Sequence, residues 1–344
     1  MGKKYRYEII LNGGETVCEP LVYTYSKTPG IELHISPEKA RIAFYQGVKH
    51  EPVEVLTSGN HLWTDAMKKV MLMHLLRYAK PLDIVNIDVT IDGISCSIFS
   101  RKKEDLPLIF SMADVELDHR FPGAWQDKNV INTILNTPKT KYDGRMNAVI
   151  ALIIAKSKKY YCEKSLYLWM SMNGFYNYIA EQYCDITGKN LKKETKKQDI
   201  FCEAMQLHKT GKGPKDEQKE VFVSKALAKM YYLNEEPENL YDKIEKGEET
   251  GLSTIIQELQ TEYEIDIDPM HFLTIWLPYQ VRCNYFHANK AMPLFMYADE
   301  HLLKALTYTN YFVERYIEEH LPDWLSTREL TDEKKILLNA CGNR

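Results

Sequence analysis

The chain has 344 residues, which at roughly 100–200 residues per domain predicts two domains. Its 44% apolar and 27% charged residues are ordinary for a globular protein and exclude a disordered chain or a collagen-like fibre. The 44 basic and 48 acidic residues give a net charge of −4, which argues against a protein that coats nucleic acid through bulk positive charge.

Membrane proteins and disulfide-bonded proteins are disfavoured as well. No apolar run approaches the ~20 residues of a membrane span, and no apolar signal core follows the N-terminus. The seven cysteines are scattered and include no Cys-x-x-Cys pair, so neither a disulfide framework nor a zinc site is indicated. We therefore expect a reduced, cytoplasmic protein with no membrane partner.

Residues 1–120 are predicted to form a β-rich domain of unknown role, such as a sensor or a module that recruits substrate. Period-two alternation bounded by turn residues marks three strands, at residues 5–11, 17–25 and 31–35. The clearest hairpin lies around Asp92-Gly93, a favoured two-residue turn, and covers residues 85–99. One helix, at residues 62–78, would cover a face of the sheet.

The pattern becomes helical beyond residue 142, after a stretch of mixed signals at residues 121–142 that is interpreted as a linker. Apolar residues at helical spacing predict helices at residues 146–155, 166–183, 217–233, 251–263, 268–287 and 299–320. Asp268-Pro269 is a helix start signal, and Leu321-Pro322 is expected to end the last helix. The predicted fold class is α+β, with a β-rich domain followed by an all-α domain at residues 143–344.

The average charge hides an uneven distribution. Residues 1–140 carry 17 basic and 17 acidic side chains, residues 141–230 carry 17 and 10, and residues 231–344 carry 10 and 21. The basic middle is concentrated in two groups of lysines, at positions 156, 158, 159 and 164 and at positions 189, 192, 193, 196 and 197. These lysines indicate either solvated helix faces or a strip that holds a phosphate backbone.

The strongest candidate for chemistry is the segment Val-Arg-Cys-Asn-Tyr-Phe-His-Ala-Asn-Lys at residues 281–290. Arg282 and His287 are costly to bury without partners, so they are expected to line a groove or an interface. On a regular helix the two side chains point about 140° apart, because each residue turns by about 100°. Pairing across the two-fold axis of a dimer would bring an arginine and a histidine together twice.

This set of residues suits RNA cleavage without a metal, because the ribose 2′-hydroxyl supplies the nucleophile. His287 would act as general base or acid, since the reference pKa of histidine, about 6.5, lies near neutrality. Arg282 would stabilise the charge that builds on the phosphate. The remaining polar residues would orient the histidine or contact substrate, with Asn284 in the catalytic set and Lys290, Asn289 and Tyr285 at the RNA.

At these positions the sequence resembles the HEPN superfamily of helical domains, whose hallmark is an arginine followed by a histidine four to six residues later. Arg282 and His287 match the two defining positions, and the longer string is similar to the Arg-x-Asn-x-x-His variant of the phage-defence ApeA group. Residues 165–176, with Trp169 and Asn173, are similar to the first helix of that family. The resemblance covers roughly residues 140–320.

The resemblance implies a metal-independent endoribonuclease without a cofactor, active as a homodimer with a composite site. Such proteins often belong to phage-defence, toxin–antitoxin or abortive-infection systems, so an antitoxin or a defence-system partner is expected. Asn173 is expected to support His287 from behind. Two departures, Cys283 after the arginine and Ala288-Asn289 in place of the usual glycine turn, leave a second interpretation open. In that interpretation the chain is a non-catalytic HEPN module that binds nucleotide, RNA or a protein partner.

Three weaker signals have simpler explanations. Asp114, Glu116 and Asp118 alternate along a predicted strand and indicate either a divalent-ion site or an exposed strand face. The Gly-Lys-rich loop at residues 211–215 lacks the spacing of a phosphate-binding loop. Asp268 near His271 is expected to cap a helix.

Overall fold

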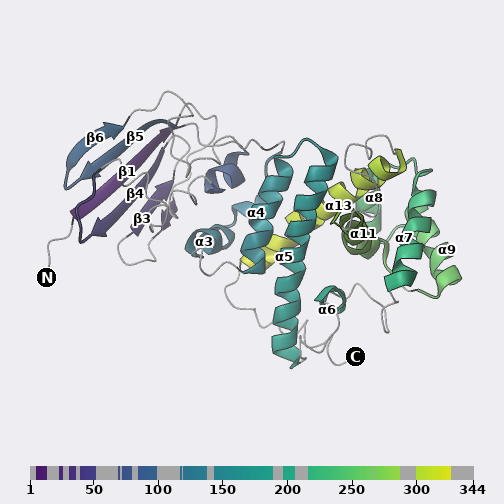
Figure 1. Ribbon diagram of the computed structural model, residues 1–344. Coiled ribbons are helices and arrows are strands. Elements are labelled where there is room, and N and C mark those ends of the chain that lie inside the picture. Colours follow the sequence, from purple (N-terminus) through teal and green to yellow (C-terminus); the bar gives the residue numbers. More distant parts are fainter. Residues whose placement is uncertain are drawn as a thin grey trace. The chain divides into compact units, whose positions relative to one another are not determined.

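The computed structural model describes residues 5–13, 23–25, 31–35, 39–51, 69, 72–79, 84–98, 117, 119–137, 143–188, 197–205, 216–265, 267–286 and 300–326. The chain divides into two compact units, Met1–Tyr142 and Asp143–Arg344 (Figure 1). The first unit is built on a sheet and the second is helical over its described residues, so the fold is α+β as predicted. No helix among the described residues has the length and apolar character that crossing a membrane requires.

Six antiparallel strands form the sheet of the first unit, in the order β2-β3-β4-β1-β5-β6. They are β1 (Tyr5–Gly13), β2 (Tyr23–Tyr25), β3 (Ile31–Ile35), β4 (Lys39–Gln46), β5 (Ile84–Ile91) and β6 (Ile94–Ile98). The strands predicted at 5–11 and 31–35 are confirmed, and the described part of 17–25 is the strand β2. β4 is absent from the predicted elements.

The centre of the sheet is the pair formed by β1 and β4. Tyr7, Ile9 and Leu11 of β1 are fully buried, as the alternation of that strand predicts. Tyr7 lies opposite Phe44 in the ladder, and their stacked ring centroids are 5.2 Å apart. β4 buries Ile42 beside Phe44, so the same alternation signal was present in its sequence.

The predicted hairpin is confirmed. β5 and β6 are joined by Asp92 and Gly93, both of which have positive φ, at 49° and 83°. This backbone matches a type I′ turn, whose twist suits a two-residue hairpin. The Asp92 carboxylate accepts a hydrogen bond from the backbone N–H of Arg6, at 2.9 Å, and ties the turn to β1.

Residues 121–137 differ from the predicted linker, because they form the short 3-10 helix η3 (Gly123–Gln126) and the helix α3 (Lys128–Asn136). Asp127 caps α3 by accepting from the N–H of Asn129. Trp125, Ile131 and Ile134 are fully buried, so this segment belongs to the core of the first unit. Within the predicted helix at 62–78, residues 69 and 72–78 are described and are helical.

The second unit contains the helices α4 (Gly144–Lys156), α5 (Tyr161–Thr187), α6 (Lys197–Ala204), α7 (Asp216–Met230), α8 (Pro237–Glu245), α9 (Gly251–Tyr263), α10 (Pro269–His271), η5 (Phe272–Trp276), α11 (Leu277–Phe286) and α13 (Glu300–Leu325). α6 and α8 are not among the predicted helices. The predicted start at Asp268 is confirmed, because its carboxylate accepts from the backbone N–H of Met270 at 2.7 Å. The helix from Pro269 to Phe286 is not uniform, since η5 is a π turn.

The prediction that Leu321-Pro322 ends the last helix is wrong. α13 continues through Pro322 to Leu325. A proline inside a helix removes one backbone hydrogen bond. Here the last turn also buries Leu321, Trp324 and Leu325, and the carbonyl of Trp324 accepts from Arg145 Nη1 at 3.0 Å. Tertiary packing therefore outweighs the local stop signal.

α4 and α5 approach each other closely at two glycines. A Cβ atom added at Gly174 would lie 2.6 Å from the carbonyl oxygen of Gly144, a separation that real Cβ atoms do not adopt. One turn further, Ser171 Oγ donates to the carbonyl of Ala148 at 2.7 Å. Both glycines are required because the backbones meet with no room for a side chain.

We expect Gly174→Ala to lower the free energy of unfolding by about 2 kcal/mol or more, because α4 and α5 must move apart. The measurement is thermal or urea unfolding followed by circular dichroism. Gly251→Ala is the matched control in a helix of the same unit, because a Cβ there meets the movable end of the Leu233 side chain. Equal stability losses in the two variants would contradict the close-contact explanation.

Candidate functional site

Arg282 lies on α11, which packs against α5 and α7 in the helical unit (Figure 1). The residues that precede it are buried from Met270 to Pro278, whereas Arg282 and Cys283 are half-buried. One turn before Arg282, the ring of Tyr279 contacts Trp169 of α5, with centroids 5.7 Å apart. The helix therefore leaves the continuously buried core at Tyr279, and the predicted arginine follows one turn later at its edge.

The rest of the predicted motif is described only in part. Arg282 Nη1 lies 3.9 Å from Cys283 Sγ. Asn284 and Tyr285 continue α11 as backbone, and the positions of their side chains are outside the described structure. His287, Asn289 and Lys290 lie outside the described residues. α11 is α-helical up to Phe286, so the angle of about 140° expected between the side chains at positions 282 and 287 is unchanged. This angle stays a reason to expect that the arginine and histidine pair between two copies.

Asn173 lies on α5 one turn after Trp169, just as Arg282 lies one turn after Tyr279. Both positions are therefore close to the same helix crossing. The Asn173 carboxamide oxygen accepts from the hydroxyl of Tyr176 and from Asn177 Nδ2, the latter at 3.3 Å, within its own helix. The predicted support of His287 by Asn173 falls on a residue outside the described structure and stays a prediction.

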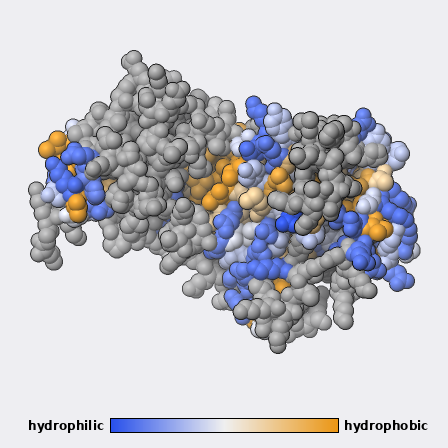
Figure 2. Space-filling view, in the orientation of Figure 1, coloured by the Kyte–Doolittle hydropathy of each residue, from blue (hydrophilic) through white to orange (hydrophobic). Residues whose placement is uncertain are grey.

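The first group of lysines in the basic middle is largely neutralised by carboxylates. Lys156, with 3% of its side chain exposed, donates to Glu314 at 3.0 Å and also to Glu318. Lys164 Nζ lies 2.6 Å from the other oxygen of Glu314. Lys158 Nζ is 3.6 Å from Glu163 Oε2. Hydrophilic residues cover the end of the α4–α5 pair, where Lys158 and Lys159 lie in the turn (Figure 2).

Burial and charge act in opposite directions within this network. Burial disfavours the Lys156 cation, but the neighbouring carboxylates outweigh burial and raise its pKa. Burial likewise opposes ionisation of Glu314, yet the two lysines hold its pKa below the ordinary value. Burial raises the pKa of Glu318, which has less compensation from cations. The network is a structural clamp between α4 and α13, and it leaves Lys156 and Lys164 little charge for phosphate.

In the second group of lysines, only Lys197 lies within the described residues, and its ammonium is 2.7 Å from the carboxylate of Glu181. The other members, at positions 189, 192, 193 and 196, are outside the described structure. A basic strip that uses them stays a prediction.

A thiol–imidazole pair that the sequence analysis missed lies at the start of the same helix as Arg282. Cys202 Sγ of α6 is 2.8 Å from His271 Nε2 of α10, and both side chains are buried. The only signal near His271 in the sequence is the capping residue Asp268. The two partners are separated by 69 positions, so no local spacing predicts the pair.

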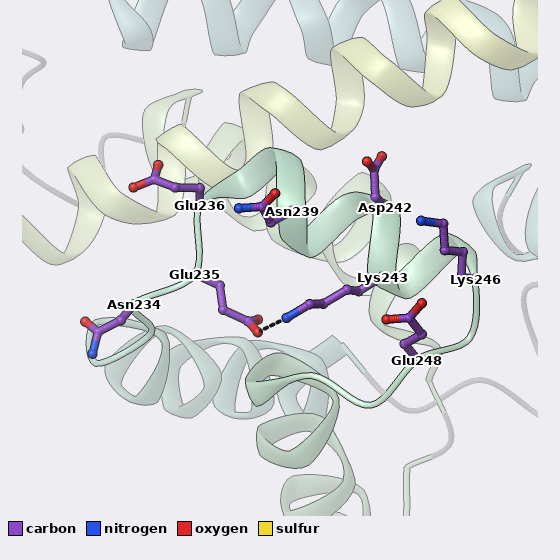
Figure 3. Close-up of a pocket in the computed structure, with 8 residues that line it drawn as sticks. All are labelled: Asn234, Glu235, Glu236, Asn239, Asp242, Lys243, Lys246 and Glu248. Atoms are coloured by element: carbon purple, nitrogen blue, oxygen red, sulfur yellow. Dashed lines mark hydrogen bonds and ion pairs between the residues drawn. The ribbon is translucent and has the colours of Figure 1, made fainter.

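A shallow polar depression of about 450 Å³ lies along α8 and the segments that flank it (Figure 3). Its lining consists of Asn234, Glu235, Glu236, Asn239, Asp242, Lys243, Lys246 and Glu248. Glu235 and Lys243 point toward each other and form an ion pair of 2.9 Å, while Glu236 and Asp242 point away from that pair. Among the described residues no three His, Cys, Asp or Glu side chains are arranged to hold a metal ion.

Two weaker candidates, the carboxylates at positions 114, 116 and 118 and the loop at 211–215, lie outside the described residues. Asn310, a buried polar residue of α13, donates to the backbone carbonyl of Tyr161 at 2.9 Å and so joins α13 to the start of α5. Its amide nitrogen therefore makes a structural hydrogen bond between the two helices.

No family model, curated protein or solved structure matches the chain.

We expect Glu314→Gln to lower the free energy of unfolding by about 2–3 kcal/mol at neutral pH, because buried Lys156 and half-buried Lys164 both lose a carboxylate. Glu318→Gln is the matched control and is expected to cost less than about 1 kcal/mol, since its site already disfavours the charge. Urea unfolding measures both values. Because the pKa of Glu314 is held below its ordinary value of 4.5, its contribution is complete above that pH and is lost as the pH falls through the folded-state pKa. A larger loss in Glu318→Gln would contradict the assignment.

Proposed function

We propose that this chain is a metal-independent endoribonuclease of HEPN type that acts as a homodimer in the cytoplasm. The biological setting we propose is phage defence or a toxin system, with an antitoxin or another defence protein as partner. The position of Arg282 gives the main support, because this half-buried arginine lies one turn beyond the buried run Met270–Pro278 and next to buried Val281, on a helix inside the bundle. A guanidinium in such a partly desolvated place stabilises phosphate charge more strongly than one in water.

The reaction follows from the residues of the motif. His287 accepts the proton of a ribose 2′-hydroxyl, and the resulting oxygen attacks the adjacent phosphorus. The bond from phosphorus to the 5′-oxygen breaks, and the leaving oxygen takes a proton from the histidine of the second copy. Arg282 carries the charge on the phosphate, and Asn284 orients the histidine. Lys290, Asn289 and Tyr285 hold the RNA on either side. The product has a 2′,3′-cyclic phosphate end.

We expect the purified full-length chain to cut single-stranded RNA in the presence of EDTA and to leave 2′,3′-cyclic phosphate ends. His287→Ala is expected to lower the rate by about 10³-fold and Arg282→Ala by about 10²-fold, because the first removes proton transfer and the second removes charge stabilisation. Gel analysis of end-labelled RNA and identification of the termini by mass spectrometry provide the measurement.

His320→Ala serves as the matched histidine control. His320 lies on α13 with its ring centroid 4.3 Å from that of Tyr316, and burial lowers its pKa. The control variant should cleave RNA like the wild type. Cleavage by His287→Ala at the wild-type rate, or a strict requirement for magnesium, would refute the proposed reaction.

A non-catalytic HEPN module that binds nucleotide, RNA or a protein partner is the second candidate. It is favoured by the described lysines, since Lys156 and Lys164 are held by carboxylates of α13. Cys283, rather than a polar residue, lies beside Arg282.

The discriminating measurements are the melting temperature and the oligomeric state of Arg282→Ala and His287→Ala. In the binding module the two side chains stabilise the dimer, so their loss should lower both while the wild type cleaves no RNA. Folded, dimeric and inactive variants would instead favour catalysis.

A further inference from the structure

The helix that carries Arg282 contains one π turn. This turn sets the direction in which the side chains of α11 point. The backbone N–H of Leu277 donates to the carbonyl of Phe272, five residues earlier, in place of the usual partner four residues earlier. A π turn amounts to one residue inserted into an α-helix. Every later side chain is therefore turned by about 100° relative to an uninterrupted helix of the same sequence. Arg282 is among those side chains.

Contacts at the start of the turn favour this rare geometry. The ring of His271 lies 5.8 Å from that of Trp276 in a T-shaped arrangement. On a regular helix two residues five apart would point about 140° apart, so the widened turn is what allows the two rings to meet. Thr274 Oγ1, inside the turn, donates at 2.7 Å to the carbonyl of Met270, which lies in α10 just before the turn.

His271 is in turn fixed from outside the helix. Its Nε2 atom is 2.8 Å from Cys202 Sγ, and His271 and Cys202 are 1% and 0% exposed. On the far side of the turn, Trp276 packs against Phe222 of α7, with ring centroids 5.7 Å apart. The π turn is thus held between α6 and α7. Both holding contacts are at its ends, at His271 and at Trp276.

The rotation of α11 about its axis decides which residues its first partly exposed turn contacts. With the π turn in place, Tyr279 meets Trp169 of α5. Cys283, next to Arg282, is half-buried. A helix without the turn would carry Tyr279 away from Trp169 and would aim Arg282 at different neighbours.

We infer that Cys202 and His271 are positioning residues that hold the π turn at Phe272–Trp276 and thereby set the direction of Arg282. This inference rests on the proposed function only in giving Arg282 a role in RNA cleavage. The geometric part, that the pair sets the rotation of α11, stands independently of that role.

The decisive test compares Cys202→Ala with a deletion of Thr274. Cys202→Ala removes the partner of His271, so the extra residue is no longer held and α11 rotates. Deleting Thr274 removes the extra residue itself and leaves a regular α-helix with both ends facing as before, so it should rescue Cys202→Ala. If Cys202 only stabilised the fold, deleting a residue from a buried helix would not restore the Cys202→Ala protein. Cys202→Ser, which keeps a donor, is the conservative variant.

The readout that does not depend on activity is the rate at which Cys283 reacts with a maleimide, resolved by peptide mass spectrometry. Rotation of α11 changes the exposure of this thiol, so we expect Cys202→Ala to change the rate by about fivefold or more in either direction. Cys202→Ser, the Thr274 deletion and the deletion combined with Cys202→Ala should stay within about twofold of the wild type. Cys162→Ala is the control for loss of a buried thiol, because Cys162 is also buried.

The second readout is RNA cleavage, in which Cys202→Ala should lower kcat by about tenfold with little change in KM, because a misdirected arginine weakens the transition state. Wild-type labelling of Cys283 in a folded Cys202→Ala protein would overturn the inference, and so would altered labelling in the Thr274 deletion. If the wild type cleaves no RNA, the proposed function fails while the labelling rates still decide whether the pair sets the helix direction.

Discussion

The contact between the backbones of Gly144 and Gly174 is the constraint on which the helical unit depends. It brings α4 and α5 close enough for the carbonyl of Ala148 to accept from Ser171, and it fixes α5 as the helix against which α6, α11 and α13 pack. A side chain at either glycine would separate the two helices and shift the surface that receives the others. The absence of two Cβ atoms thus has consequences across the whole bundle.

Local signals predicted the elements whose geometry is decided locally. The hairpin at Asp92-Gly93 and the helix start at Asp268 depend on turn and capping preferences, and both formed as predicted. Pro322 carried an equally clear local signal, yet α13 continues through it because the last turn is buried. Failures of this kind arise where tertiary burial, which a single sequence does not display, is worth more than local preference.

The candidate site was predictable in part for the same reason. Arg282 stands out in the sequence as a charged residue in a largely apolar segment, and its half-buried position at the edge of the core agrees with that pattern. The partners of Cys202 and Lys156 did not stand out. Cys202 meets a histidine 69 positions away, and Lys156 meets carboxylates 158 and 162 positions away. Such pairings are set by the packing of helices, and no spacing in the chain records them.

The π turn also has a meaning for how related chains would diverge in length. A one-residue insertion inside a helix ordinarily turns the rest of the helix away from its partners, and selection removes it. An insertion absorbed as a π turn is tolerated, because the parts of the helix before and after it still present the same sides to their neighbours. A relative that lacks the turn would have one residue fewer between the positions of Asp268 and Arg282 and would still present the arginine on the same side. The separation of these two residues, 14 positions in this chain, therefore records whether a relative has the turn.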